Sequence, residues 1–216
     1  MLLDKDIREP LFEFLEERYG KVRILEEKTV GRSRADVVMV IPEKIVGIEI
    51  KSDADTYTRL ERQGADYDLY FDANIVVVGS SHASHVAEHV PEHWGIVSVE
   101  QVEDHVDFYI VREMQDNPHA QLLRTIRVLW RPELAHIQEK YGLPMYKQKS
   151  KDFVRTIIVD RLPVEVVHKE ISDALFERDY PAMLAEIQEF RKAQAAKRGK
   201  TVRKKRKKYR RKKRDA

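Results

Sequence analysis

The sequence predicts an α/β core, a helical domain after it and a disordered basic tail. Up to about residue 112, short runs rich in Val and Ile alternate with segments of helical spacing, which is the pattern of a mixed α/β layer. From about residue 117 only helical spacing remains, and Lys and Arg dominate the last twenty residues. We therefore expect an α/β core over 1–116, a helical domain over 117–196 and a basic tail over 197–216.

The first half begins with a helix and continues mainly as strands. Ile7, Leu11 and Leu15 recur at helical spacing, and Gly20 ends the pattern. Apolar runs bounded by Gly, Pro or charged residues predict strands over Val22–Leu25, Asp36–Ile41, Lys44–Ile50, Ile75–Val78, Ile96–Val99 and Phe108–Val111. The last two strands should form a hairpin. Two further helices are expected over Thr56–Phe71 and Ser80–Val90.

The second half carries apolar stripes at helical spacing, separated by Pro132, Gly142 and Pro144. Two of the stripes fall in the neighbouring segments Ser150–Leu162 and Val164–Phe176. These segments fit a helix-turn-helix unit that reads DNA, and they fit two packed helices equally well in spacing. Plain packing is the commoner arrangement, so the sequence leaves DNA reading open as the less favoured interpretation.

The composition excludes several kinds of site. The chain has 216 residues and no cysteine, which rules out disulfides, thiol catalysis, zinc–cysteine fingers and iron–sulfur clusters. No apolar run approaches the roughly 20 residues that a membrane-spanning helix needs. The first six residues lack the basic-then-apolar pattern of a signal peptide. We expect a cytoplasmic protein with no membrane partner.

Charge is distributed unevenly along the chain. Residues 197–216 hold 14 of the 40 Lys and Arg residues and one acidic residue, a net charge of +13, whereas residues 1–196 have a net charge of −10. Like charges repel one another and cannot bury apolar surface, so the tail should be disordered when free. Runs of this density usually bind phosphate backbones. The expected partner is therefore nucleic acid, and a solubilising or targeting tail is the alternative.

Asp36, Glu49 and Lys51 form the candidate chemical site. Side chains alternate along a strand, so Glu49 and Lys51 project to one face while Ile48 and Ile50 face the opposite layer. If the second and third strands form a hairpin, Asp36 lies beside Glu49. Two carboxylates on an apolar sheet repel each other unless a cation lies between them. A hard ion with oxygen ligands, Mg²⁺ or Mn²⁺, meets that need.

The helix expected after these strands adds two polar side chains. Gln63 and Tyr67 are four residues apart and lie on one helix face, where an amide and a phenol can cover the site. Lys51 adds a positive charge that can stabilise a phosphorane-like transition state or orient the attacking water. The competing interpretation is a charged strand end that pairs with a nearby arginine. A lone Glu-x-Lys carries little weight, but the whole succession favours function.

This succession, on this order of elements, resembles the PD-(D/E)XK nuclease superfamily, specifically its RecB-like branch, over residues 1 to about 112. Bacterial and phage nuclease-like proteins with a Glu-Ile-Lys-Ser-Asp strand and a Leu-Trp-Arg-Pro-Glu-Leu-like stretch in a helical second half are similar over most of the chain. The resemblance implies a restriction-endonuclease-like α-β-β-β-α-β core. It also implies a metal-dependent phosphodiesterase that acts on nucleic acid, usually DNA.

The resemblance assigns roles position by position. The catalytic positions that it implies are Asp36, Glu49, Lys51, Gln63 and Tyr67. Asp36 and Glu49 are similar to the metal-binding carboxylates, and the carbonyl group of Ile50 is a further ligand for Mg²⁺ or Mn²⁺. RecB-like proteins often place a metal-binding histidine upstream of the aspartate, but no histidine precedes His82 here. A third ligand would then be Glu27, Glu17 or water.

Two other groups of residues have open interpretations. Four histidines recur at near-helical spacing: His82, His85, His89 and His93. Histidines in such an arrangement can bind zinc. Because Pro91 breaks the helix and no acidic or cysteine partner completes a zinc site, we interpret them as surface or interface histidines. The second group is Tyr57, Arg59 and Arg62. These residues could contact the backbone of a nucleic-acid substrate or simply form a solvated helix face, and the two interpretations are about equally consistent with the sequence.

The sequence as a whole predicts a Mg²⁺-dependent deoxyribonuclease whose basic tail attaches it to nucleic acid. The alternative is a non-catalytic DNA- or RNA-binding protein built on a nuclease-derived scaffold. The retention of all five motif residues favours the enzyme, because a scaffold has no need of them.

Overall fold

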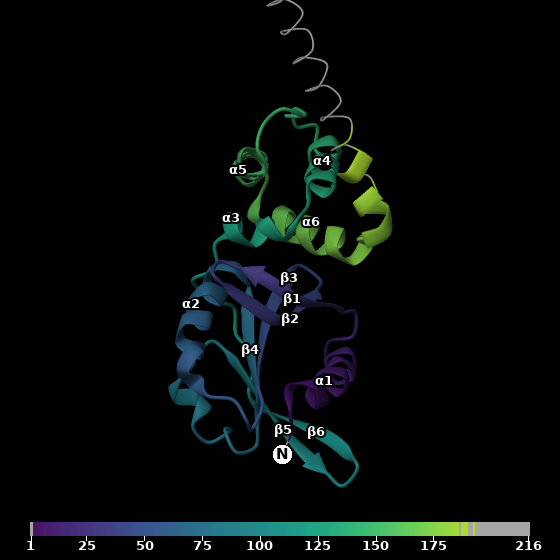
Figure 1. Ribbon diagram of the computed structural model, residues 1–216. Helices are drawn as coiled ribbons and strands as arrows, with labels where there is room; N and C mark the ends of the chain where they lie inside the picture. The colour runs from purple at the N-terminus through teal and green to yellow at the C-terminus, as the bar shows by residue number, and fades with distance from the viewer. Residues whose placement is uncertain (1, 186, 190–191, 193–216) are drawn as a thin grey trace, which may run out of the picture.

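The computed structural model describes residues 2–185, 187–189 and 192, and it shows a six-stranded mixed sheet with a helical region beyond one end (Figure 1). The strand order in the sheet follows the chain order. The strands are β1 (Arg23–Val30), β2 (Ser33–Ile41), β3 (Lys44–Lys51), β4 (Ala73–Gly79), β5 (Gly95–Val102) and β6 (His105–Arg112). The predicted mixed α/β class is confirmed. The tail predicted over 197–216 lies outside the described residues.

Strand pairing follows from the turns. Strands β1, β2 and β3 are joined antiparallel by short turns, β3, β4 and β5 pair in parallel, and β5 and β6 form the predicted hairpin. Gly31 turns the chain between β1 and β2 with a φ of 57°, a left-handed conformation that glycine adopts without strain. A Cβ atom on Gly31 would lie 2.2 Å from the Asp66 carboxylate, so this turn also needs glycine for close approach.

Each face of the sheet is covered by a helix, and the two helices lie on opposite sides (Figure 1). Helix α1 (Asp4–Tyr19) buries Ile7, Leu11 and Leu15 against the face that carries Ile48 and Ile50. The other face is covered by the 3-10 turn η1 (Tyr57–Arg59), helix α2 (Leu60–Tyr70) and the helical region. Strand β4 is buried along its whole length, as expected for a central parallel strand covered on both faces.

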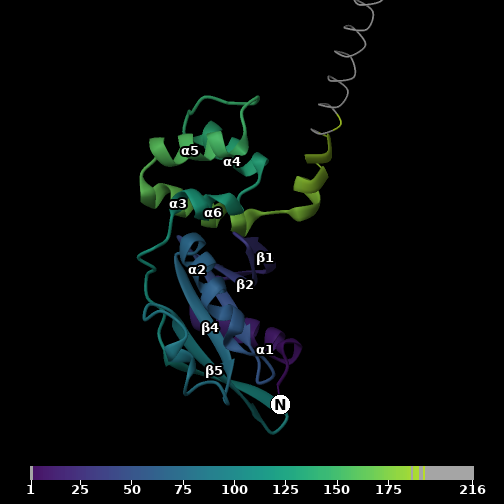
Figure 2. The ribbon, with the colours of Figure 1, turned by 60° about the vertical axis from the view of Figure 1, so that its left-hand side comes forward.

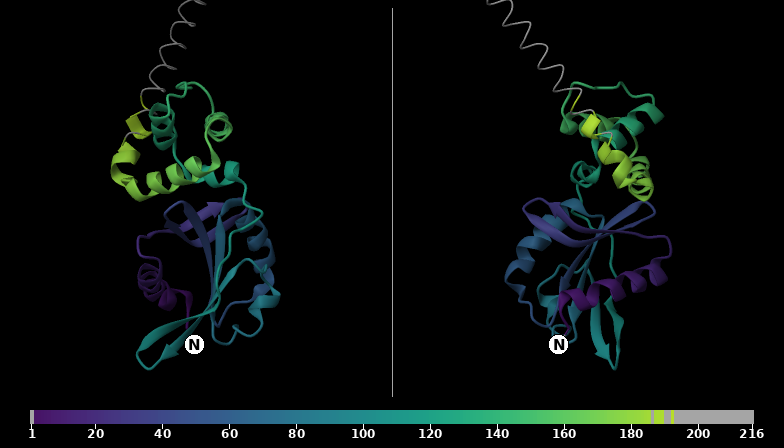
Figure 3. Two further views of the ribbon diagram at one scale, coloured as in Figure 1. Left: turned by 180° about the vertical axis from the view of Figure 1, so that it is seen from behind. Right: turned by 45° about the vertical axis from the view of Figure 1, so that its right-hand side comes forward.

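The helical region forms two layers beyond the sheet. It comprises α3 (Leu122–Thr125), the 3-10 turn η3 (Ile126–Val128), α4 (Arg131–Lys140), α5 (Lys151–Arg161) and α6 (Val164–Glu177). Figure 2 shows α3 and α6 next to the sheet and α4 and α5 farther away. The β5–β6 hairpin lies at the opposite end of the sheet, as both views of Figure 3 show.

Helix α6 ties the helical region to the sheet. It contacts β2 and β3 as well as α5, and the Glu43 N–H donates to Ser172 Oγ at 3.0 Å. His168 Nδ1 lies 3.3 Å from Asp72 Oδ1, and this contact raises the pKa of His168. One apolar core runs from the sheet face into the helices. Packing of this kind is what two neighbouring helices such as α5 and α6 most commonly do. DNA reading by this pair, and a domain division near residue 116, stay predictions.

The helix predicted over Ser80–Val90 is wrong. This segment forms successive turns and the 3-10 turn η2 (Val86–Glu88). Several of its backbone bonds join residues three apart, such as His82 N–H to Gly79 O. Only Val86 and Val90 are buried, which is too small an apolar stripe to hold an α-helix against the sheet. The helix predicted over Thr56–Phe71 is also shorter than expected, because η1 replaces its first turn.

Among the residues that the structure describes, no helix combines the length and apolar character that crossing a bilayer requires.

A buried ion pair holds the helical region together and carries the first testable prediction. Both Arg178 and Glu133 are almost completely buried, with two parallel contacts of 2.7 Å between their side chains. Replacing Arg178 with Met leaves the Glu133 charge buried without its partner, so we expect the free energy of unfolding to fall by about 3–5 kcal/mol in urea titrations. Lys169→Met, which breaks an exposed ion pair with Asp173, is the control and should unfold close to wild type. An Arg178→Met protein as stable as this control would contradict the prediction.

Candidate active site

The five predicted motif residues come together on one face of the sheet. Asp36 lies on β2 and Glu49 and Lys51 on the adjacent β3, where the antiparallel pair Val37 and Ile48 sets the register. The Ile50 N–H donates to Asp36 Oδ2 at 3.0 Å, which ties the two strands together at the site. Helix α2 lies over this face and supplies Gln63 and Tyr67.

Glu49 is at the centre of the hydrogen-bond network. Its side chain is 1% exposed, and Oε1 accepts from Lys51 Nζ at 2.6 Å and from Gln63 Nε2 at 2.5 Å. Oε2 accepts from the Tyr67 hydroxyl at 2.5 Å. Charged hydrogen bonds of this kind compensate the cost of burying a carboxylate. The network therefore fixes Glu49, and with it the geometry of the whole site.

Asp36 lies in a less favourable environment. Burial, followed by the negative charge of Glu49, raises the pKa of Asp36 to about 6. Burial and the Glu49 charge also raise the pKa of the Tyr67 hydroxyl, so this group stays protonated and donates to Glu49. The negative charge of Glu49 therefore disfavours the ionised form of Asp36, although the Lys51 ammonium group partly offsets this effect.

A polar cavity of about 380 Å³ opens over the carboxylates. Its cationic lining residues are Arg8, Arg32, Arg34, Lys51, Arg59 and Arg62, and its acidic ones are Asp4, Glu27, Asp36, Glu49 and Asp55. Of the three residues considered for substrate contact, Arg59 and Arg62 line this cavity. Tyr57 does not line it and instead stacks on His89 with ring centres 4.2 Å apart.

Arg8 belongs to the site, although no pattern in the sequence indicates it. Its guanidinium group contacts Asp4 at 2.7 Å and Glu27 at 2.9 Å, donates to the Asp36 carbonyl at 3.3 Å and lies 3.9 Å from Asp36 Oδ1. On the chain, Asp4 and Arg8 have the spacing of an ordinary ion pair on a helix. Only the docking of α1 on the sheet brings them to the cavity.

The two candidates for a third ligand differ in position. Glu27 lies between the paired residues Glu26 and Lys28 of β1, which places it opposite Asp36, and it lines the cavity. Its two oxygens pair with Arg8 and with Arg34 at 2.5 Å, so Glu27 as a metal ligand stays a prediction. Glu17 lies on the exposed side of α1 and is not among the lining residues described for the cavity.

The residues fit a magnesium-type ion with few protein ligands. The described residues contain no group of three or more His, Asp or Glu side chains placed to hold a metal. Mg²⁺ is commonly held by one or two carboxylates and keeps several waters. Asp36, Glu49 and the Ile50 carbonyl provide such an oxygen donor set, and a cation between the two carboxylates would offset the Glu49 charge that raises the pKa of Asp36.

The histidine series is not arranged on one helix face. The turn structure of this segment spreads His82, His85 and His89, and His93 lies 3.0 Å from Asp68. Tyr57 contacts both His82 and His89, so these two pack around an aromatic side chain. The interpretation as surface or interface histidines fits this arrangement.

Comparison with known proteins places the chain in a family. A family model described as bacteriophage P4 protein cII matches residues 2–197. The chain belongs to the bacteriophage P4 cII family. The range shared with the cII family includes all the cavity residues and helices described above and ends where the basic run begins.

Other comparisons add little to the cII assignment. No curated protein matches the chain. Among solved structures, SfsA of Pyrococcus furiosus in complex with Ca²⁺ matches at 14% sequence identity with a TM-score of 0.34. The match covers 56% of this chain and 66% of the SfsA chain, which is less than two thirds of its length.

The repulsion between the two carboxylates leads to a second testable prediction. Because the pKa of Asp36 is raised above its usual 3.8 to about 6, the folded protein holds this proton more tightly than the unfolded chain. Stability should therefore fall as the pH rises from about 4 to about 6, by up to roughly 3 kcal/mol without metal. Asp36→Asn keeps an acceptor for the Ile50 N–H but has no carboxyl group to ionise. It should therefore be more stable than wild type at neutral pH.

The measurement is thermal unfolding at acidic and neutral pH in the presence of a chelator. The advantage of Asp36→Asn should shrink as the pH falls toward 4 and disappear below the ordinary pKa of 3.8, where the wild-type carboxyl is protonated in both the folded and the unfolded states. A variant that is less stable than wild type at neutral pH would show that Asp36 is not under repulsion from Glu49.

Proposed function

We propose that this protein is a metal-dependent nuclease with a restriction-endonuclease-like core, similar to the PD-(D/E)XK superfamily, that acts on DNA in the cytoplasm. The observation that supports this most is the convergence of Asp36, Glu49, Lys51 and Gln63 on one polar cavity, with the buried Tyr67 hydrogen-bonded to Glu49. The arginines on its rim provide charge for backbone phosphates.

In this proposal Asp36, Glu49 and the Ile50 carbonyl hold Mg²⁺ or Mn²⁺. A bound divalent cation supplies Lewis-acid polarisation of a phosphate oxygen and makes water a stronger nucleophile. The Lys51 ammonium group lies 2.6 Å from Glu49 and faces the cavity, where it offsets negative charge that develops on the phosphate. Gln63 and Tyr67 keep the Glu49 carboxylate in one orientation through their hydrogen bonds.

A non-catalytic nucleic-acid-binding protein is the second candidate. The observation that favours it is the saturation of Glu49, whose two oxygens already accept three hydrogen bonds from Lys51, Gln63 and Tyr67. In that case the network is structural, and the basic tail and the rim arginines bind nucleic acid.

A substrate panel separates the two candidates. Purified protein is incubated with circular and linear DNA, single- and double-stranded, and with RNA, each with Mg²⁺, Mn²⁺ or chelator. The nuclease proposal expects cleavage of DNA that requires the metal. Binding of every polymer without cleavage of any, under all the metal conditions, would favour the non-catalytic protein instead.

A further inference from the structure

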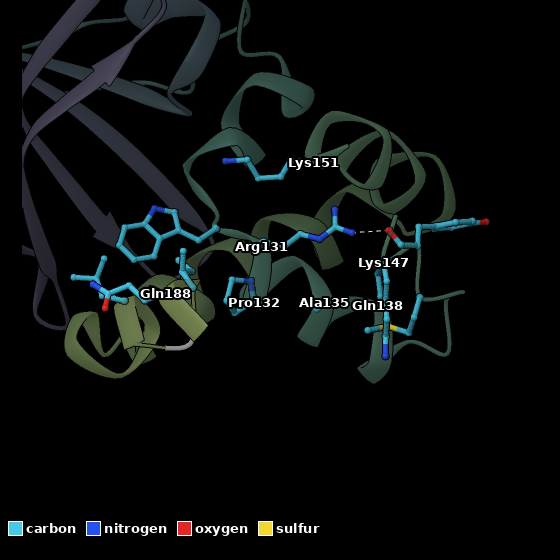
Figure 4. Close-up of a pocket in the computed structure, with 12 residues that line it drawn as sticks. Arg131, Pro132, Ala135, Gln138, Lys147, Lys151 and Gln188 are labelled. Carbon is cyan, nitrogen blue, oxygen red and sulfur yellow. Dashed lines mark hydrogen bonds between the residues drawn. The ribbon is translucent and has the colours of Figure 1, made fainter. Parts of the chain in front are cut away.

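A second cavity lies in the helical region, away from the carboxylates. It has a volume of about 680 Å³, within the range of roughly 300–1,000 Å³ typical of ligand sites. Its lining residues come from α4 and the residue before it, from the loop before α5 and the first residue of α5, and from the helical residues 180–185 and 187–189. In Figure 4, Gln188 lies on one side of this cavity and Lys147 and Gln138 on the other, with Arg131 between them. We refer to it as the helical groove.

The helical groove combines aromatic and apolar surface with positive charge. Its aromatic and large apolar members are Trp130, Met145, Tyr146, Leu184 and Ile187. Its cations are Arg131, Lys147 and Lys151, and no acidic residue is among the described lining residues. The carboxylate cavity differs in this respect, because cations and acids alternate around it.

The positive charge of the groove is not neutralised by the described part of the chain. Arg131 donates to the backbone carbonyls of Tyr146, Lys149 and Ser150, which are neutral acceptors. No ion pair joins Arg131, Lys147 or Lys151 to an acidic side chain among the described residues. Burial, followed by the charge of Arg155, lowers the pKa of Lys151, and the opposing effect of the neighbouring Asp152 does not reverse this shift.

Trp130 offers a stacking surface in this groove. Arg178 lies over its ring, 4.9 Å from the ring centre, and covers one face of the indole. Trp130 is half-buried and also meets the Tyr180 ring in an edge contact with 5.6 Å between ring centres, whereas Trp94, the other tryptophan of the chain, is 0% exposed in the core. An aromatic ring that lines a cationic groove is the arrangement that binds single-stranded nucleic acid, because unpaired bases stack while lysine and arginine bind the phosphates.

We infer that the helical groove binds a single strand of nucleic acid, with a base against Trp130 and phosphates against Lys147 and Lys151. Charge complementarity selects this occupant. The chain's own tail, with 14 Lys and Arg residues, would be repelled by the groove cations. A duplex keeps its bases stacked inside and presents none to Trp130. The inference takes its ligand class from the proposed function, but it needs neither the carboxylates nor catalysis.

The test uses the fluorescence of Trp130 in the full-length protein with a chelator present, so that no cleavage occurs. Short single-stranded oligothymidylate should quench the emission, and Trp130→Phe should show no change because Trp94 is buried. The double variant Lys147→Gln/Lys151→Gln should bind about tenfold more weakly in this signal. Its log-affinity against log-salt slope should be shallower by about 0.7 for each lost phosphate contact.

Lys140→Gln/Lys169→Gln is the matched control, since it removes two lysines of the same region that pair with Glu170 and Asp173 outside the groove. This control should titrate like wild type. Unchanged Trp130 emission with oligothymidylate, or coincident curves for the two double variants, would overturn the inference. Quenching by polyglutamate as strong as that by oligothymidylate would also overturn it, in favour of an acidic protein partner. None of these measurements depends on DNA cleavage. A failure here would therefore leave the nuclease proposal standing, and a failure to detect cleavage would leave this inference standing.

Discussion

Lys51→Ala is expected to slow metal-dependent DNA cleavage by a factor of about 10² or more. Lys51 is 5% exposed and lines the polar cavity, so bulk water screens its charge only weakly. Removing it takes away stabilisation of the negative charge that develops on the phosphate. The measurement is the single-turnover rate of cleavage at saturating DNA and metal.

Lys44→Ala is the matched control, because Lys44 begins the same strand and pairs with Asp116 away from the cavity. It should cleave at the wild-type rate. Gln63→Ala should have a milder effect than Lys51→Ala, since Glu49 keeps its bonds to Lys51 and Tyr67. Circular dichroism confirms that each variant is folded. Equal rates for Lys51→Ala and Lys44→Ala would remove Lys51 from the proposed mechanism.

Ending the chain after Ala196 is expected to remove most of the affinity for long DNA at moderate salt. The missing residues carry a net charge of +13, and the rest of the chain has a net charge of −10, so the shortened protein is repelled by phosphate. The full-length protein should show a slope of log affinity against log salt of roughly −0.9 for each phosphate neutralised on duplex DNA. The shortened protein should show a shallow slope.

The same pair of proteins separates attachment from chemistry. The described lining residues of the carboxylate cavity all fall between Asp4 and Gln63 and are kept in the shortened protein, so it should keep its cleavage rate once DNA is saturating. Binding is measured across a salt series and cleavage at high DNA concentration. Equal salt slopes with and without residues 197–216 would contradict the role of the tail and favour a targeting or solubilising segment.

The carboxylate site could be predicted because it depends on local rules. Alternation along β3 puts Glu49 and Lys51 on one face, and the short turn after β2 sets the register that brings Asp36 beside Glu49. Helical spacing on α2 then places Gln63 and Tyr67 over the same point. Each step joins residues that are close in sequence or lie on neighbouring strands.

The parts that could not be predicted depend on distant contacts. Arg8 reaches Asp36 only because α1 packs across the sheet, and no spacing on the chain encodes that distance. Arg32 and Arg34 reach the cavity because Asp66 on α2 holds the turn between β1 and β2, accepting from the Arg32 N–H at 3.0 Å. The false helix at Ser80–Val90 has a different origin, since only Val86 and Val90 of this segment are buried and they make too small an apolar stripe to hold a helix.

The helical groove was overlooked for a similar reason. Trp130, Lys147 and Leu184 are far apart in sequence and meet only when the helices pack. On the chain, Trp130 follows the apolar residues Ile126 and Leu129 at helical spacing, where packing in the core is the commoner use of a tryptophan. The one feature of the sequence that could have indicated the groove is a series of cations from Arg124 to Lys151. Between Lys140 and Lys151 this series contains no acidic residue.

The most direct test of the central claim is a comparison of wild type and Asp36→Asn on end-labelled linear DNA, with Mn²⁺ or with chelator. Asp36→Asn preserves the size of the side chain and the hydrogen bond from Ile50, and removes only the charge that would hold the metal. If Asp36 and Glu49 form a metal-dependent nuclease site, the DNA is cut only by wild type and only with Mn²⁺. Cutting by both proteins alike, or by neither with any divalent ion, would contradict the claim.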